Sequence, residues 1–306
     1  MKKISIIVPC FNEQEVIQKT YERLRKLSLP GYEKEILFVD DGSRDRTPEI
    51  LKGFAARDPQ VRVLLFVRNF GHQPAVSAGI AHCSGDAAVI LDADLQDPPE
   101  LIGEMLEKWE EGNEIVYGKR LKRKGESVFK KMTAWAYYRV LGMLGGNYIP
   151  RDTGDFRMID RKVCDYLNAL SEHNRFLRGL TAWAGFSSCP VEYIREERAA
   201  GKTKYTLKKM LRLAGDGIAA FSDRPLKLPL YFGIGLMLIS AVYLVLGIIF
   251  GVLGIWPAYH VLFAITFLLL SLFGIFLGIM GMYLGRMYDE LKDRPLYMIK
   301  EKVNFS

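Results

Sequence analysis

Cysteine and histidine are scarce in this sequence, with four residues of each among 306. The cysteines are scattered and form no Cys-x-x-Cys pair, which argues against a zinc site or a disulfide framework and is compatible with a reducing cytosol. No histidine has a second histidine or a cysteine at metal-binding spacing. Gly-x-Ser-x-Gly and Walker patterns are also missing, so neither a serine nucleophile turn nor a P-loop is predicted.

A secretory signal peptide is not recognisable either. Residues 1–9 carry two lysines, but the apolar run that follows them is too short for a signal peptide. We interpret this segment as a first buried strand, and we expect the domain that it begins to stay in the cytoplasm.

Patterns for nucleic-acid recognition are missing as well, because there is no recognition helix, zinc finger or RNP pattern. The net charge of +7 is modest, and much of the basic excess lies in residues 119–131 and 195–212. Such clusters suit phosphate-bearing partners or an anionic membrane surface. We therefore expect no nucleic-acid partner.

The composition changes after Lys227, where a charged and mixed chain becomes almost wholly apolar until residue 286. Leu228–Phe250 and Val261–Leu284 are each long enough to cross about 30 Å of hydrocarbon as a helix. The joint at 251–260 has no charged side chain, and basic residues flank the other ends of both segments. The positive-inside tendency predicts a multi-pass protein of the inner or plasma membrane, with both termini and the large domain cytoplasmic.

Residues 205–221 carry apolar side chains on one helical side and basic ones on another, which is typical of an interfacial helix. Residues 126–146 fit a core helix or a membrane-surface helix equally well. Small-xxx-small glycine pairs in the two apolar segments are compatible with a homo-oligomer. The predicted units are a cytoplasmic domain (1–200), an amphipathic juxtamembrane segment (201–227), a two-helix transmembrane hairpin (228–286) and a cytoplasmic tail (287–306).

The first half of the chain alternates short apolar strands with helical stretches, which predicts an α/β fold with a doubly wound, mostly parallel sheet. The predicted strands are Ile4–Val8, Glu35–Val39, Val61–Phe66 and Ala87–Leu91. The predicted helices are Glu13–Ser28, Thr47–Arg57 and Pro74–His82. Such sheets bind ligands outside the carboxyl ends of their strands, so polar residues that follow the strands predict a site.

Two acidic pairs follow predicted strands. Asp92 and Asp94 flank one residue, and Gln96 follows, which gives three oxygen donors suited to Mg²⁺ or Mn²⁺. Capping alone would not need both aspartates. Asp40 and Asp41 suit hydrogen bonds to a base or a ribose, although helix capping by a neighbouring residue would explain part of that motif.

Asn12 and Glu13, after the first strand, fit either a nucleoside pocket or helix caps. For His72 and His82 we expect packing or capping, with a place near the nucleotide as the alternative for His72.

These motifs together resemble those of the family 2 glycosyltransferases with the GT-A fold. The motifs that carry this resemblance are Pro9-Cys10-Phe11-Asn12-Glu13, Val39-Asp40-Asp41-Gly42-Ser43 and Asp92-Ala93-Asp94-Leu95-Gln96-Asp97-Pro98-Pro99. Later motifs resemble the polyprenyl-phosphate glycosyltransferases, which include the GtrB-type bactoprenol glucosyltransferases and are similar to dolichol-phosphate mannose synthase. Those motifs are Asn69–Gln73, Gly118-Lys119-Arg120, Asp152–Arg157, Arg175–Gly179 and Arg198 with Gly201–Tyr205.

The resemblance implies inverting transfer of a sugar from a nucleotide donor to the phosphate of undecaprenyl or another polyprenyl phosphate at the cytoplasmic membrane face, with Mg²⁺ or Mn²⁺ as cofactor. UDP-glucose is the expected donor, and UDP-GlcNAc, a UDP-linked amino-arabinose and GDP-mannose are the alternatives. The Gln-x-x-Arg-Trp pattern of processive polysaccharide synthases is missing, which favours one transfer per acceptor.

The resemblance also assigns residues by position. The nucleotide-sugar pocket would be lined by Pro9, Asn12, Glu13, Asp40, Asp41, Asp92 and Arg120. The metal would be held by Asp92, Asp94 and Gln96. The lipid phosphate would be bound by Arg157, Arg198, Lys202 and Lys204. The residues needed for catalysis would be Asp155, Asp94, Arg198 and Lys202. For the basic stretch, membrane anchoring without a catalytic part is the alternative, and Arg175 and Arg178 could be structural.

Asp155 could act as a general base or as a positioning group. A phosphate monoester has a second pKa of about 6, so the acceptor is largely dianionic at neutral pH and hardly needs a general base. Asp155 could instead orient the arginines or the sugar, and Asp152 is the alternative residue. A non-catalytic membrane scaffold and a flippase subunit are the competing functions. The retained aspartates argue against the scaffold, and two spans without an intramembrane charge argue against the flippase.

Overall fold

The computed structural model describes residues 1–121, 153–172, 175–194 and 259–305. Within this part of the chain, eight strands form one mixed sheet in the order β7-β5-β6-β4-β1-β2-β3-β8. The strands are β1 (Lys2–Cys10), β2 (Tyr32–Asp40), β3 (Val61–Phe66), β4 (Ala87–Ile90), β5 (Ile115–Arg120), β6 (Thr153–Asp160), β7 (Ser188–Tyr193) and β8 (Ile299–Val303). The helices are α1 (Ile17–Lys26), α2 (Thr47–Ala55), α3 (His72–His82), the 3-10 helix η1 (Pro99–Leu101), α4 (Ile102–Glu110), α6 (Arg161–Ala169), α7 (Leu177–Trp183) and α10 (Tyr259–Leu291).

The four strands expected from the sequence form the parallel centre of the sheet. β1 pairs in parallel with β2 and β4, and β2 pairs in parallel with β3. Outside this centre, β6 runs antiparallel to β4 and β5, and β8 runs antiparallel to β3. The predicted α/β fold is confirmed, and the sheet as a whole is mixed.

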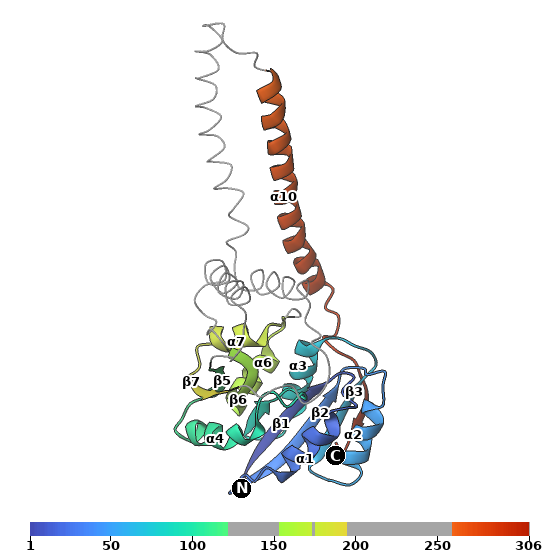
Figure 1. Cartoon of the computed structure of the whole chain (residues 1–306), viewed down its shortest axis with the longest axis vertical. Helices are drawn as coiled ribbons and strands as arrows, with labels where there is room; N and C mark the ends of the chain where they lie inside the picture. Colours follow the sequence, from blue (N-terminus) through green and yellow to red (C-terminus); the bar gives the residue numbers. More distant parts are fainter. Residues whose placement is uncertain (122–152, 173–174, 195–258, 306) are drawn as a thin grey trace.

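Helices cover both faces of the sheet, as Figure 1 shows, because the central strands are apolar on both faces. Along β1, Ile4, Ile6 and Val8 pack against α1, α2 and α4, whereas Ile7 packs on the side of α3, α6 and α7. Each face therefore has its own buried apolar cluster, and burying apolar surface is the dominant favourable term in folding. The loops that follow β1, β2, β3 and β4 meet at one edge between these layers.

The end of the chain is part of the sheet. α10 runs away from the sheet in Figure 1, and the residues after it return to form β8 beside β3. Asn304 donates through Nδ2 to the carbonyls of Ala55 at 2.7 Å and Val61 at 2.9 Å. Residues 287–306, which the sequence predicts as a cytoplasmic tail, thus contribute a strand to the sheet of the large domain.

The predicted span Leu228–Phe250 and the predicted helices at 126–146 and 205–221 lie outside the described residues, and Val261–Leu284 lies within α10. In the part of the chain that the structure describes, no helix combines the length and apolar character that crossing a membrane requires. The two-span hairpin stays a prediction.

Candidate active site

Two carboxylates, Asp92 and Asp155, lie just beyond the paired residues of β4 and β6, at the carboxyl edge of the parallel strands. β6 runs antiparallel to β4, with Arg157 opposite Ile90. Asp92 and Asp155 lie two residues beyond this last pair, on the sides of β4 and β6 that face the same edge. This edge is where open α/β sheets bind ligands.

His72 lies between these two carboxylates. It is the first residue of α3, and its Nε2 is 3.4 Å from Oδ1 of Asp92 and 3.4 Å from Oδ2 of Asp155. The imidazole is 34% exposed, so it is not a core side chain. The prediction of packing or capping for His72 was therefore wrong, because the residue contacts both acidic groups of the site.

The surroundings of Asp92 disfavour its ionised form. Burial raises its pKa most, and His72 counteracts part of that rise. The neighbouring carboxylates of Asp155, Asp97 and Asp94 raise it further, to about 6. A carboxylate crowded in this way by like charges is stabilised by a cation placed beside it.

Asp155 has the opposite environment. Its side chain is 13% exposed, and burial alone would raise its pKa. Arg178 on α7 outweighs burial, because its Nε donates to Oδ1 at 2.6 Å and its Nη2 donates to Oδ2 at 2.7 Å. Together with nearby His72 and Arg157, this pair holds the pKa of Asp155 well below its usual range. A carboxylate bound on both oxygens by a guanidinium is a poor proton acceptor.

Arg157 is 4% exposed and bonded inside the domain. Its Nη2 donates to the carbonyl of Gly154 at 3.0 Å, and its Nη1 donates to the hydroxyl of Thr181. Burial lowers its pKa to about 10. Because its described partners are internal, the predicted contact of Arg157 with a phosphate stays a prediction.

The turn after β4 is held in a defined shape. Asp94 Oδ1 accepts from the backbone N–H of Gln96 at 3.2 Å, and Leu95 between them has a φ of 57°. Asp97 is fully buried and accepts a hydrogen bond from the hydroxyl of Tyr193, which fastens the turn to β7. The backbone of the turn is therefore fixed from both ends.

Among the described residues, no group of three or more His, Cys, Asp and Glu side chains is arranged to hold a metal by itself. The predicted ligands Asp92, Asp94 and Gln96 offer two carboxylates and one amide oxygen on a single turn. These donors are of the type that Mg²⁺ and Mn²⁺ prefer, and such ions often complete their coordination with substrate phosphates and water. The donor set and the raised pKa of Asp92 both fit a divalent cation.

Asp41 organises the loop before α3. Its Oδ1 accepts from the N–H of Phe70 at 2.6 Å, and its Oδ2 accepts from the N–H of Gly71 at 2.9 Å and from Nδ2 of Asn69 at 2.7 Å. Gly42 beside it has a φ of 67°, and a Cβ there would lie 2.3 Å from a backbone carbon of this loop. The carboxylate of Asp41 thus holds the loop, and its predicted contact with a nucleoside stays a prediction.

Only one of the two carboxylate oxygens of Asp40 has a hydrogen-bond partner among the described residues. Its Oδ2 accepts from the N–H of Ser43 at 3.1 Å, whereas its Oδ1 is buried and has no hydrogen-bond partner among the described residues. Burial raises the pKa of Asp40. A buried polar atom without a partner costs free energy, so this oxygen is a candidate acceptor for a bound ligand.

The loops after β1 and β2 are bonded to each other. The N–H of Asn12 donates to Ser43 Oγ at 2.8 Å, and the N–H of Glu13 donates to Thr47 Oγ1 at 2.9 Å. α1 begins only at Ile17 and has no side-chain cap. The capping alternative for Asn12 and Glu13 is therefore wrong for α1.

Comparison with known proteins identifies the family. The profile of glycosyl transferase family 2 matches residues 5–167. The chain belongs to glycosyltransferase family 2.

Relatives match nearly the whole of this family 2 glycosyltransferase. It is 50% identical to an uncharacterized glycosyltransferase of Bacillus subtilis (strain 168), YkcC, over 97% of this chain and 93% of that one. It is 41% identical to the SfII prophage-derived bactoprenol glucosyl transferase of Shigella flexneri, over 98% of both chains. A solved structure of glucosyl-3-phosphoglycerate synthase from Mycobacterium tuberculosis is similar at a TM-score of 0.48 and 20% identity, over 71% of this chain and 78% of that chain.

Some predicted residues of this glycosyltransferase have no described side chain. Arg198, Lys202 and Lys204 lie outside the described residues, and Arg120 is placed only through its backbone in β5. Pro9 is partly buried near the end of β1. The structure thus brings together the acidic half of the predicted site.

Sequence reasoning gave too little weight to two residues of this glycosyltransferase site. His72 has no second ligand at metal-binding spacing in the sequence, and for Arg178 the sequence allows a structural role as well as a functional one. The position of His72 in the sequence could have identified it, because a histidine that begins a helix after a parallel strand lies at the carboxyl edge of the sheet. For Arg178, no local pattern identifies a partner on β6.

Proposed function

We propose that this protein transfers a sugar from a nucleotide donor to the phosphate of undecaprenyl or another polyprenyl phosphate, with inversion at the anomeric carbon. UDP-glucose is the donor that we favour. The observation that carries the proposal is the 41% identity to a bactoprenol glucosyl transferase over 98% of both chains. Identity over the whole length includes the residues outside the family profile, where the acceptor class would be decided.

The donor would lie along the carboxyl edge of the sheet. Oδ1 of Asp40, which has no hydrogen-bond partner among the described residues, would accept a hydrogen bond from the nucleoside. Asp92, Asp94 and Gln96 would hold a Mg²⁺ or Mn²⁺ ion, which, when bound, would neutralise charge on the leaving diphosphate. The raised pKa of Asp92 supports this assignment, because a cation removes the repulsion that raises it.

In the reaction, an oxygen of the lipid phosphate attacks the anomeric carbon, and the bond from that carbon to the diphosphate oxygen breaks. The acceptor is already largely ionised near neutral pH, so no proton has to be removed from it. Asp155 would therefore act by positioning. Support comes from its two bonds to Arg178 and its lowered pKa, which leave it little capacity to take a proton.

Arg178 would share the positive charge that the acceptor phosphate requires. A guanidinium held by a carboxylate keeps a fixed orientation, and arginine binds phosphate through a planar fork. The basic residues Arg198, Lys202 and Lys204 would supply further positive charge.

We also propose that the protein is a multi-pass protein of the inner or plasma membrane, with the catalytic domain and both termini in the cytoplasm. The two apolar segments of the sequence support this. The pairing of β8 with β3 supports the topology, because the end of the chain then lies on the same side as the large domain. The glycine pairs of the apolar segments make a homo-oligomer a further part of the proposal.

The test is transfer of radiolabelled sugar to undecaprenyl phosphate by the full chain in detergent, with a panel of UDP- and GDP-sugars and Mg²⁺ or Mn²⁺. We expect labelled lipid with UDP-glucose, lost with EDTA and in Asp94→Ala. Product with another donor would replace the sugar assignment and keep the reaction class. No labelled lipid from any donor, with a folded protein, would reject the acceptor and favour the scaffold or flippase.

A further inference from the structure

The segment after α10 contacts the end of β3, which leads into the 68–71 loop before α3. Tyr297 stacks on Phe66, with ring centroids 5.2 Å apart and an interplanar angle of 3°. The carbonyl of Met298 accepts from the N–H of Val67 at 3.1 Å. Ile299 in β8 lies opposite Phe66 in β3, next to an irregularity in the pairing. The end of β3 is therefore fixed by the end of the chain.

From Phe66 the contacts continue to the active site. Phe66 meets Phe70 edge-on, with centroids 5.8 Å apart. The N–H of Phe70 donates to Asp41, and two residues later His72 lies 3.4 Å from both Asp92 and Asp155. Two ring contacts, Tyr297–Phe66 and Phe66–Phe70, and the short backbone from Phe70 to His72 thus connect Tyr297 to the carboxylates of the site.

We propose that Tyr297 is a positioning residue for the active site. Its ring keeps Phe66 and Phe70 in place, and through them it keeps the 68–71 loop on Asp41 and His72 between the two carboxylates. The catalytic domain is then incomplete without the segment that follows α10. The assignment of the site to sugar transfer rests on the proposed function, whereas the coupling of Tyr297 to the loop does not.

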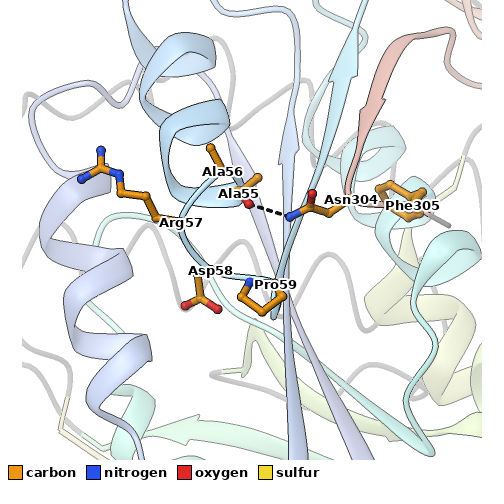
Figure 2. A pocket seen from close by; sticks show the side chains of 7 residues that line it. All are labelled: Ala55, Ala56, Arg57, Asp58, Pro59, Asn304 and Phe305. Atoms are coloured by element: carbon orange, nitrogen blue, oxygen red, sulfur yellow. Dashed lines mark hydrogen bonds between the residues drawn. The ribbon is translucent and has the colours of Figure 1, made fainter.

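A matched control residue, Asn304, lies at the other end of β8 from Tyr297. Figure 2 shows Asn304 reaching the carbonyl of Ala55, beside a hollow lined by residues 55–59 and Phe305. Asn304 also bonds the carbonyl of Val61, at the beginning of β3 and away from the 68–71 loop. Asn304→Ala therefore removes two hydrogen bonds of the tail and none of the contacts of Tyr297.

The experiment compares Tyr297→Ala, Tyr297→Phe and Asn304→Ala in the full chain in detergent. The first measurement is hydrogen exchange at the backbone amides of Phe70 and Gly71. This measurement requires neither the nucleotide sugar nor the lipid phosphate. We expect exchange to be at least tenfold faster in Tyr297→Ala and within twofold of wild type in the other two variants. The second is UDP-glucose kinetics, where we expect at least a fivefold loss of kcat/KM in Tyr297→Ala alone.

Two results would overturn the proposal. One is unchanged exchange at these amides in Tyr297→Ala, and the other is an equal effect of Asn304→Ala, which would make the tail a general anchor. If wild type transfers no sugar but exchange follows the expected pattern, the proposed function fails and the coupling stands. If wild type is active and exchange is unchanged, the coupling alone fails.

Discussion

Replacing Asp92 by asparagine should abolish metal-dependent activity and yet raise thermal stability at pH 8. Burial and neighbouring carboxylates raise the pKa of Asp92 from 3.8 to about 6, and a difference of that size corresponds to about 3 kcal/mol at most. The side chain is 31% exposed, so solvent screening reduces this to about 1–2 kcal/mol. For a domain of this size that is about 2–8 °C in Tm.

The pH dependence has a definite sign. The folded carboxyl binds its proton more tightly than the unfolded one, so ionised Asp92 lowers the stability of the folded state above pH 6. The cost falls as the pH drops through about 6, and it is gone below the ordinary pKa of an aspartate, about 4. The gain from Asp92→Asn should therefore be largest at pH 8 and small at pH 4.5.

Asp155→Asn should have the opposite effect on stability. It removes the bidentate partner of Arg178 and leaves two arginines without their nearest negative charge. Removing one partner of a buried pair costs about 3 kcal/mol or more, which is a loss of about 6–12 °C in Tm.

Both variants can be measured by thermal unfolding in detergent with EDTA present, at pH 8 and pH 4.5. Chelation matters because a bound metal would stabilise the wild type and hide the cost of the free carboxylate. Effects of the same sign at pH 8, or a gain in Asp92→Asn that persists at pH 4.5, would refute this electrostatic account of the site.

Three further predictions concern the loops and cations around these carboxylates. Gly42→Ala should cost about 2 kcal/mol or more, because an added Cβ would lie 2.3 Å from backbone and the φ of residue 42 is 67°. Gly103→Ala on α4, where an added Cβ would meet no described atom within 4 Å, should be neutral or stabilising in the same melting assay. His72→Gln should move the acid limb of the pH profile of kcat/KM upward, since His72 lowers the pKa of Asp92, and an unmoved limb would count against the contact. Arg178→Lys should lower kcat at least tenfold in the transfer assay, because an ammonium cannot reproduce both bonds to Asp155.

The parallel centre of the fold was readable from sequence because its strands are short, apolar and separated by helical stretches. The predicted Val61–Phe66 agrees with β3, and Ala87–Leu91 exceeds β4 by one residue. Local propensity and periodicity are enough for such elements. The later strands were missed because β6, β7 and β8 pair with distant segments, and nothing in their local composition specifies that pairing.

The sequence by itself predicted the acidic groups at this edge, since residues that follow parallel strands lie at the same edge of a sheet. It did not predict that His72 and Arg178 would contact them. It left the roles of those groups undecided. Antiparallel pairing of β6 with β4 brings Asp155 to the same edge as Asp92, with His72 in contact with both, and α7 supplies Arg178. These long-range contacts push two similar carboxylates toward opposite pKa values, because one is crowded by negative charge and the other is bound by a guanidinium. Tertiary structure decided this, since a charge responds to its neighbours in space and not to those along the chain.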